Sequence, residues 1–462
     1  MSGTISSAGI GSGLDVNSLV SQLVAAERAP QDTQLAKRTN TTSAQLSAYK
    51  AIQGAMTNLQ SALTALQGTS GAFAASTAVS ADNTVFTASA TQTAAAGTYQ
   101  VQVQSLATAQ KLASAGYGST ATAVGTGRLS FSAGSNTFNV DIDNTNNTLS
   151  GIRDAINAAS GNTSVSASLI TADDGVHLVL TARNTGVANA IDVTASGGDG
   201  GLAALAYDPK NNATSLSQLT AASDAVVKIE GYTYTSASNQ VSGSVAGVTL
   251  NLVAAKPGTT LALTVGHDTA GVTKALQAFV GAYNTLQSTL GNLTAYNAST
   301  KTASALTGDS LARQAQAQVR NALSALTPGA SGGVRSLFDL GISGNDDGSL
   351  TLDTGKLGSA LSGGFDAAKS LLAADGPVGS ALTTALNGFI GTNGALQSRT
   401  DSLGKRLDDI SKQKSDLDER MSALSARYTA QYSALDSLMA QMNTTSTFLT
   451  NQFTQMRANN NA

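Results

Sequence analysis

The chain has 462 residues, of which 41% are hydrophobic and 12% charged, with a net charge of −3 and no cysteine. This length predicts about three domains, and the composition is that of a folded rather than a disordered chain. It excludes disulfides and cysteine-based chemistry, and no dense basic run or long apolar run is present that would favour nucleic-acid binding or a membrane span.

Two helical patterns open the chain. In the first, apolar residues gather on one side, and Ser12 followed by Asp15 predicts a capping box at the helix start. A polar stretch at 39–43 predicts a break before the second pattern, in which apolar residues alternate three and four apart. The apolar side of the first helix comprises Leu14, Leu19, Leu23 and Val24. The seam of the second comprises Tyr49, Ile52, Met56, Leu59, Leu63 and Leu66.

Between residues 77 and 267 the hydrophobic period changes to two. Apolar and polar residues alternate in segments separated by Gly and Asn, as in half-buried strands. A short helix interrupts these segments, marked by Leu149, Ile152 and Ile156. This part of the chain therefore predicts a β-rich head with a minor helix. The clearest alternating sets are Tyr99, Val101 and Val103; Phe138, Val140 and Ile142; and Val176, Leu178 and Leu180.

Two more helices are predicted after the strands. Over 272–293 the apolar residues alternate four and three apart, and Asp268 is placed to cap the start of this helix. A further helix is predicted over 309–326. Its apolar side comprises Leu311, Ala315, Val319 and Leu323.

The last part of the chain carries a heptad pattern. Twelve of the 16 a and d positions over 396–449 are apolar, where composition alone gives about seven. A period of about 3.5 residues predicts one long helix with a narrow seam for another helix. Lys414 and Gln431 interrupt the seam and are interpreted as polar core residues that fix the register. The seam includes Leu403, Leu407, Ile410, Leu417, Met421, Leu424, Leu435, Leu438, Met442 and Leu449.

The two helical ends of the chain are predicted to pair with each other. Neither end can bury its own seam, and lone helices are marginal in water; two unrelated coiled-coil tails are the alternative. The predicted fold class is α+β, with the N- and C-terminal helices paired in a coiled-coil or helical-bundle leg and β-rich head domains inserted between them. The predicted domains are a flexible N-terminal leader or terminal leg segment (1–41), a helical leg (42–76 with 268–430), a β-rich head domain (77–115 with 222–267), a second β-rich head domain with a small helix inserted in the first (116–221), and a C-terminal leg segment (431–462).

Motifs for catalysis and metal binding are incomplete. The Gly-rich motif at 329–333 lacks the strand and the helix that flank a hydrolase nucleophile elbow. The calcium-like turn at 345–348 lacks the carboxylates expected at both ends of its frame. His177 and His267 have no ligand partners at metal-binding spacing. No enzyme activity, metal or cofactor is therefore predicted.

Several short segments follow one another in order along nearly the whole chain, and together they are more specific than any one of them alone. They are 9–16 (GIGSGLDV), Asp224 and Ala225 with Gly231 and Asn239, 247–250 (GVTL), Phe279 with Tyr283 and Asn284, Gly308 with Asp309, Gly341 with Ile342, and Leu435 with Asp436, Met439, Met442 and Asn443. In this order they resemble flagellar hook-associated protein 2, the family of flagellar filament caps. The segment 224–250 resembles caps rather than flagellin or another flagellar axial protein, which is the alternative.

The resemblance implies a structural, non-catalytic protein that is secreted through the flagellar type III export route to the distal tip of the bacterial flagellum. It implies a ring-like homo-oligomer of the pentamer type that promotes flagellin insertion, with hook-filament junction proteins as further partners. An export chaperone is expected to cover the C-terminal seam, because an exposed apolar stripe of that length invites aggregation. Leu14, Leu19 and Leu23 lie outside the long seam and are predicted to contact the filament.

The tyrosines of the head leave a second class of function open. Aromatic side chains suit sugar contact, so four tyrosines on one face would make the head an adhesin for host glycans. Tyrosines that simply pack in strands are the alternative. The four residues are Tyr117, Tyr207, Tyr232 and Tyr234.

Overall fold

The computed structural model describes residues 15–326 and 333–460, so the predicted positions Ser12 and Leu14 lie outside the described residues. The chain forms two compact units. One consists of Met1–Gly68 with Thr273–Ala462, and the other of Thr69–Val272. We call them the helical unit and the β unit.

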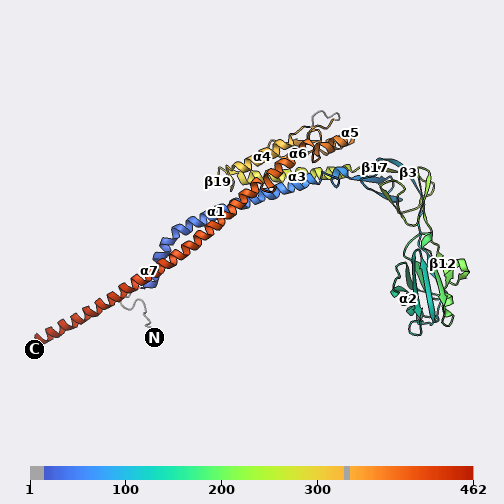
Figure 1. The fold of residues 1–462 in the computed structure, drawn as a ribbon, viewed down its shortest axis with the longest axis horizontal. Helices are drawn as coiled ribbons and strands as arrows, with labels where there is room; N and C mark the ends of the chain where they lie inside the picture. Colours follow the sequence, from blue (N-terminus) through green and yellow to red (C-terminus); the bar gives the residue numbers. More distant parts are fainter. Residues whose placement is uncertain (1–14, 327–332, 461–462) are drawn as a thin grey trace. The chain divides into compact units, whose positions relative to one another are not determined.

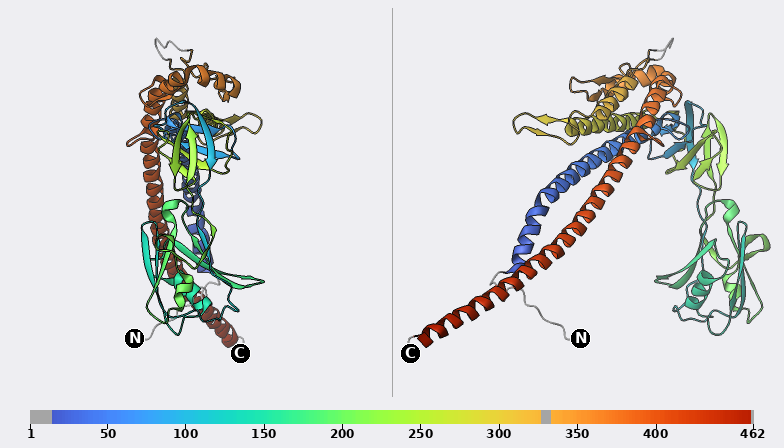
Figure 2. Two further views of the ribbon diagram at one scale, coloured as in Figure 1. Left: turned by 90° about the vertical axis from the view of Figure 1, so that its right-hand side faces the viewer. Right: turned by 60° about the vertical axis from the view of Figure 1, so that its left-hand side comes forward.

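The helical unit contains most of the helices in the described part of the chain (Figure 1). They are α1 (Val16–Thr64), α3 (Thr269–Thr294), which crosses the boundary between the units, α4 (Ser310–Leu323), α5 (Thr354–Leu372), α6 (Pro377–Ile390) and α7 (Ala395–Asn460). Two short hairpins accompany them, β18 (Tyr296–Asn297) with β19 (Thr302–Ala303) and β20 (Ile342–Gly344) with β21 (Leu350–Leu352). Helices α1 and α7 lie side by side in Figures 1 and 2, which confirms the predicted pairing of the chain's two ends.

Helix α1 is continuous, and the break predicted at 39–43 is wrong. Thr39 and Thr41 donate their hydroxyl protons to carbonyl oxygens four residues earlier, both at 2.9 Å, so these polar side chains are satisfied inside the helix. Thr42 is buried. Packing along α7 therefore overrides the weak local propensity of the polar stretch. The described part of the predicted flexible leader, 16–41, is helical.

The core of the helical unit lies where α1 packs against α6 and α7 and where α6 packs against α4. The α1 side of this core is the predicted seam, Tyr49, Ile52, Met56, Leu59, Leu63 and Leu66, in which every residue is exposed by 2% or less. Asp268 caps α3 as predicted, accepting the Gly271 N–H at 2.8 Å. Helix α4 ends at Leu323, three residues before the predicted end, because Ser324 already has the non-helical backbone of a C-cap.

Helices α5 and α6 have no counterpart among the predicted elements. Glycines 355, 358, 363 and 364 lower the helix propensity of α5, and Gly364 leaves the helical region at φ −155° and ψ 43°, which kinks the helix. Helix α6 begins with Pro377, a residue suited to the first helical position. Both helices bury leucines, among them Leu371 and Leu382 at 0% exposure, so tertiary packing stabilises them where local signals are weak.

The β unit has two hydrophobic cores, each between antiparallel sheets. Lobe 1 combines the sheet β1-β17-β3-β13-β14 with the sheet β15-β16-β2. Its strands are β1 (Ser76–Ser80), β2 (Phe86–Ala90), β3 (Gly97–Ser105), β13 (Ala225–Ile229), β14 (Tyr232–Ser236), β15 (Gln240–Ser242), β16 (Val248–Leu252) and β17 (Leu261–His267).

Lobe 2 is formed by the chain between β3 and β13. It combines the sheet β11-β10-β9-β5-β6 with the sheet β12-β4-β8-β7 and helix α2 (Leu149–Ala158). Its strands are β4 (Lys111–Ala113), β5 (Gly127–Ala133), β6 (Asn136–Ile142), β7 (Val165–Ala172), β8 (Gly175–Ala182), β9 (Ile191–Ser196), β10 (Tyr207–Asp208), β11 (Ala213–Thr214) and β12 (Ser217–Thr220). The alternation predicted for β3 and β6 is confirmed by their burial patterns. In β8 the predicted Val176, Leu178 and Leu180 are buried, but Val179 between them is buried as well, so the strand does not alternate strictly. The predicted domain limits themselves stay predictions.

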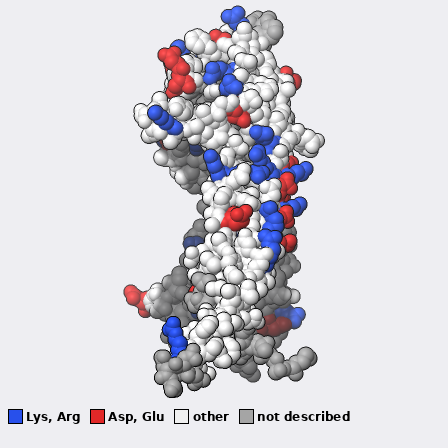
Figure 3. Space-filling model, turned by 90° about the vertical axis from the view of Figure 1, so that its left-hand side faces the viewer, with Lys and Arg blue, Asp and Glu red and all other residues white. Residues whose placement is uncertain are grey.

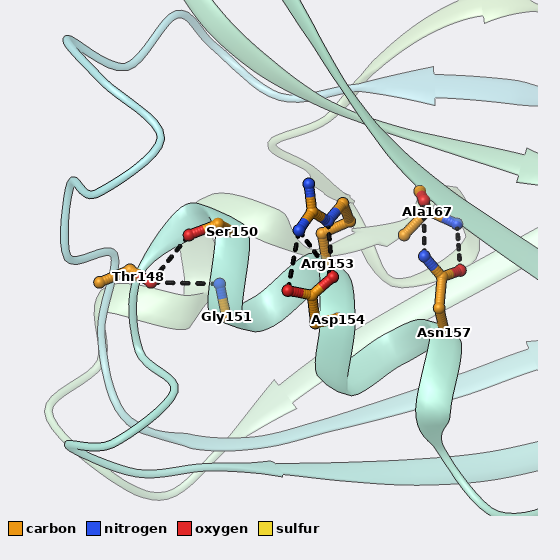
Figure 4. Close-up of polar contacts among 7 residues, drawn as sticks. All are labelled: Thr148, Ser150, Gly151, Arg153, Asp154, Asn157 and Ala167. Atoms are coloured by element: carbon orange, nitrogen blue, oxygen red, sulfur yellow. Dashed lines mark hydrogen bonds and ion pairs between the residues drawn. The ribbon is translucent and has the colours of Figure 1, made fainter.

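Helix α2 is fixed in lobe 2 by polar contacts at both ends (Figure 4). Thr148 caps its start, accepting the Gly151 N–H at 3.1 Å. Near its end, the Asn157 side chain donates to the Ala167 carbonyl at 2.8 Å and accepts the Ala167 N–H at 2.9 Å. The amide thus pairs with strand β7 as another strand would, which anchors the helix while Ile152 and Ile156 fill the core.

His177 in β8 faces a hydrogen-bond acceptor at each ring nitrogen. Nδ1 lies 2.8 Å from the Ser114 carbonyl oxygen and Nε2 lies 2.9 Å from a carboxylate oxygen of Asp174. Only the protonated imidazolium can donate to both. The Ser114 carbonyl first, and the Asp174 carboxylate second, therefore raise the pKa of His177 above its ordinary value.

A raised pKa in the folded state makes the stability of lobe 2 depend on pH. The contribution of His177 is complete below the unfolded pKa of about 6.5 and is lost as pH rises through the raised folded pKa. Because Asp174 is largely exposed, we expect this loss of stability to be small. Urea unfolding at pH 5.5 and pH 8 should show this difference in the wild type and not in His177→Gln. A difference of the same size in the variant would contradict the assignment.

Candidate assembly interface

Polar side chains connect α1 and α7 along their length. Arg28 donates to Asp32 on its own helix at 2.6 Å and to Asp418 on α7 at 2.5 Å. Further along, Arg38 donates to Gln413 at 2.9 Å. The pKa of Arg28 is raised, first by its hydrogen bond to Asp32. Exposed contacts of this kind add little stability, but they match one antiparallel register of the two helices.

Helices α1 and α7 do not pack closely along their whole shared length. A groove of about 540 Å³ lies between them and is lined by Arg28, Leu35, Leu407 and Lys414, among others. The Lys414 side chain is exposed, and so is that of Gln431. The interpretation of these two residues as polar core residues is therefore wrong, because α7 has only α1 beside it here and keeps part of its surface free.

The heptad seam of α7 divides into a buried part and an exposed part. Leu403, Ile410, Leu417 and Met421 are buried at 0–8% exposure, and Leu407 and Leu424 are half-buried. The same a and d positions are exposed further on, at 46% for Leu435, 53% for Leu438, 61% for Met442 and 47% for Leu449. Figures 1 and 2 show the reason: α7 continues beyond the start of α1.

The end of α7 carries an uncharged apolar surface, which we call the tail stripe. Its members are the large exposed side chains Leu435, Leu438, Met439, Met442, Phe448, Leu449, Phe453 and Met456. Twelve of the 25 residues 396–420 are charged, against two of the 36 residues 421–456, so the change from buried to exposed seam coincides with a loss of charge. Figure 3 shows acidic and basic side chains next to one another along one edge of its face, beside a large uncharged area.

Four members of the tail stripe were not among the predicted seam residues. Met439, Phe448, Phe453 and Met456 are exposed by 39–63%. Three of them lie beside the a and d positions, and Met456 follows the last heptad considered. The signal that could have identified them is the combination of large apolar side chains with an almost complete absence of charge.

The start of α1 holds the described filament-contact candidates, Leu19 and Leu23. Leu19 is half-buried and Leu23 is 37% exposed. The neighbouring Val16 and Val20, at 2% and 3%, are buried and were missed by the sequence analysis although they are spaced four apart. Leu23 is therefore the exposed large apolar side chain of this helix start among the described residues.

The four tyrosines proposed as a glycan-binding face do not form one. Tyr207 is buried and Tyr117 is half-buried, and both pack in the core of lobe 2. Tyr232 and Tyr234 are exposed by 81% and 37% on β14 in lobe 1. Two of the four tyrosines thus belong to a core and the other two lie on another lobe, and the adhesin hypothesis loses the feature on which it depended.

Comparisons with known proteins agree with the sequence pattern. Profiles of the flagellar hook-associated protein 2 N-terminus and C-terminus match residues 12–110 and 222–444, and a flagellin hook IN motif matches 128–184 in lobe 2. The B-type flagellar hook-associated protein 2 of Pseudomonas aeruginosa is 34% identical over 94% of this chain and 94% of that protein. The chain belongs to the flagellar hook-associated protein 2 family.

Other members of the hook-associated protein 2 family extend the similarity over the full length. That of Escherichia coli K12 is 33% identical over 97% of this chain and 98% of its own. The crystal structure of the D1-D2-D3 domains of the Escherichia coli flagellar cap protein FliD, at 32% identity, covers 77% of this chain and 99% of that one with a TM-score of 0.63. The predicted family and α+β fold class are confirmed.

Membership of the hook-associated protein 2 family identifies the general role of the chain. It is a structural protein of the flagellar filament cap, at the distal tip of the flagellum, and it is not an enzyme. None of the helices in the described part of the chain combines the length and the apolarity that a membrane crossing requires.

Proposed function

We propose that this protein caps the filament as a ring-like homo-oligomer of the pentamer type, with the end of α7 and the start of α1 as the parts that contact the filament. Flagellin that reaches the tip is retained beneath the ring and inserted into the growing filament. The observation that carries this proposal is the division of one helix, α7, into a part with a buried seam and many charged residues and a part with an exposed seam and few charged residues.

The tail stripe supports an assembly role because its exposure is unfavourable in an isolated chain. Its eight large side chains lie within 22 residues of one helix and are about half exposed, so burying the rest of each would contribute about 0.7–1.5 kcal/mol, half of the value for complete burial. The polar residues between them are mainly Ser, Thr, Asn and Gln, which can hydrogen-bond to any neighbour without fixing a partner by charge. Such a surface suits neutral, apolar helices of further copies and of the filament.

The other proposed partners are inferred from the tail stripe and from membership of the family. We propose that Leu14, Leu19 and Leu23 contact the filament together with the tail stripe, and that hook-filament junction proteins are early neighbours. An export chaperone that covers the tail stripe before secretion through the flagellar type III route would prevent aggregation. The division into a leader, a leg, two head domains and a C-terminal segment stays part of this proposal.

The test is complementation of a host strain that lacks this gene. Without the protein, or with Leu438→Ser, Met442→Ser and Leu449→Ser combined, we expect flagellin in the medium and cells without filaments. A control at polar positions of the same segment, Ser437→Ala, Thr444→Ala and Thr447→Ala combined, should restore filaments, because the bonds that the structure shows for those hydroxyls go to backbone carbonyls of their own helix. Normal filaments with the first triple variant would reject the role of the tail stripe.

A further inference from the structure

The chain passes between the two lobes of the β unit at two places that are bonded to each other. Thr108 lies on the way into lobe 2 and Ser223 on the way back. The Thr108 N–H donates to the Ser223 carbonyl at 2.9 Å, and the Ser223 N–H donates to the Thr108 carbonyl at 3.2 Å. The Thr108 hydroxyl also donates to the Ala221 carbonyl at 2.7 Å. The connection is therefore a short ribbon and not two independent linkers.

A turn of lobe 2, residues 185–187, makes three further hydrogen bonds across the junction. Thr185 donates its hydroxyl proton to the Ala237 carbonyl of lobe 1 at 2.8 Å. The Gly186 N–H donates to the Thr108 carbonyl at 3.2 Å. The Val187 N–H donates to a carboxylate oxygen of Asp224 at 2.7 Å, a charge-assisted bond to the residue directly before β13.

Gly186 brings the backbones of the two lobes into direct contact. Its φ is +99°, and a Cβ atom built on it would lie 2.6 Å from both the Cβ and the carbonyl oxygen of Ala237. Any other residue would be strained and would also push Ala237 away. Gly186 is buried, so this contact excludes water from the centre of the junction.

Asn239 completes the junction from the side of lobe 1. Its side chain donates to the Ala107 carbonyl at 3.0 Å and accepts the Ala107 N–H at 2.7 Å. This fixes the segment that leaves β3 just before Thr108. A loop of lobe 1, residues 237–239, thereby holds both the exit of the chain and the turn 185–187 of lobe 2.

We propose that these contacts form an interlobe joint that holds lobe 2 in one orientation on lobe 1, so that the β unit moves as a single body. The joint consists of Thr108, Thr185, Gly186, Val187, Ser223, Asp224, Ala237 and Asn239. Among these residues Asp224 is the one carboxylate, and its bond to the Val187 N–H is the charge-assisted one, so it is the residue chosen to test the joint. The inference concerns the isolated chain and does not depend on the proposed ring.

Distances between spin labels test the joint in the full-length protein. The chain has no cysteine, so labels attach only at introduced ones. Thr137→Cys on β6 of lobe 2 and Ser89→Cys on β2 of lobe 1 are exposed positions outside the joint. Pulsed electron spin resonance should give one narrow distance distribution for this pair. In Asp224→Ala it should become about twofold wider, as expected when a fixed hinge is released.

Two glycine variants provide the matched comparison. Gly186→Val should shift the mean distance, because the new side chain meets Ala237. Gly197→Val, also at positive φ (+69°) in lobe 2 but with open space around its Cβ position, should leave the distribution unchanged. A broad distribution before any joint residue is changed, or an unchanged narrow one in Asp224→Ala, would overturn the proposal.

Discussion

Leu417→Ala is expected to lower the free energy of unfolding of the helical unit by about 2–5 kcal/mol, the usual cost of removing a fully buried leucine. Leu417 is a d position of α7 with 0% exposure, in the part of the helix that lies beside α1. The alanine would leave a cavity between two helices whose polar contacts are too exposed to compensate. Far-UV circular dichroism during denaturation measures the effect, because nearly all described helices belong to this unit.

Leu438→Ala is the matched control for this prediction. It removes the same side chain from the same heptad position of the same helix, three heptads later, where 53% of the residue is exposed. The unfolding free energy should change by no more than about 0.5 kcal/mol. Equal destabilisation by the two variants would mean that the end of α7 is buried in the isolated chain, and the tail stripe would then not be a free surface.

The heptad pattern of α7 could be predicted from the sequence, but the coverage of its seam could not. Periodicity shows that Leu417 and Leu438 lie on the same face of a helix. The heptad position of the two residues is the same, so periodicity does not distinguish them. What separates them is where α1 begins, near Val16, since α7 then has no described helix beside it. Whether a seam residue of α7 is covered depends on how far α1 extends, and the local pattern of α7 carries no information about the extent of α1.

Tertiary packing also explains the elements that were missed. The polar residues at 39–43 and the glycines of α5 weaken a helix by local propensity, and both segments are helical because neighbouring helices bury one side.

The contacts of the interlobe joint could not be predicted from the sequence either. Asp224 and Asn239 belong to segments that resemble the family, yet nothing in the sequence links them to Gly186, which the fold alone brings to Ala237.

Asp309→Ala is expected to destabilise the helical unit by about 2–4 kcal/mol, because Asp309 serves two elements at once. One carboxylate oxygen caps α4, accepting the Ala312 N–H at 2.9 Å, and losing such a cap costs about 0.5–2 kcal/mol. The other accepts the hydroxyl of Tyr49 at 2.6 Å. Tyr49 is 1% exposed, and its pKa is raised first by burial and then by this bond. In the variant the buried Tyr49 hydroxyl loses the carboxylate that accepts its proton, which costs a further 1–3 kcal/mol, approximately.

A double-mutant cycle with Tyr49→Phe separates the two roles of Asp309. Tyr49→Phe alone should cost about 1 kcal/mol, since it removes the hydrogen bond while the cap remains. In that background Asp309→Ala no longer strands a hydroxyl, so it should cost only the cap, about 0.5–2 kcal/mol. The coupling between the two sites should therefore be about 1–2 kcal/mol, within the range for groups in direct contact. Additive losses would show instead that the contact between α1 and the start of α4 contributes nothing beyond packing, and that Asp309 acts on α4 alone.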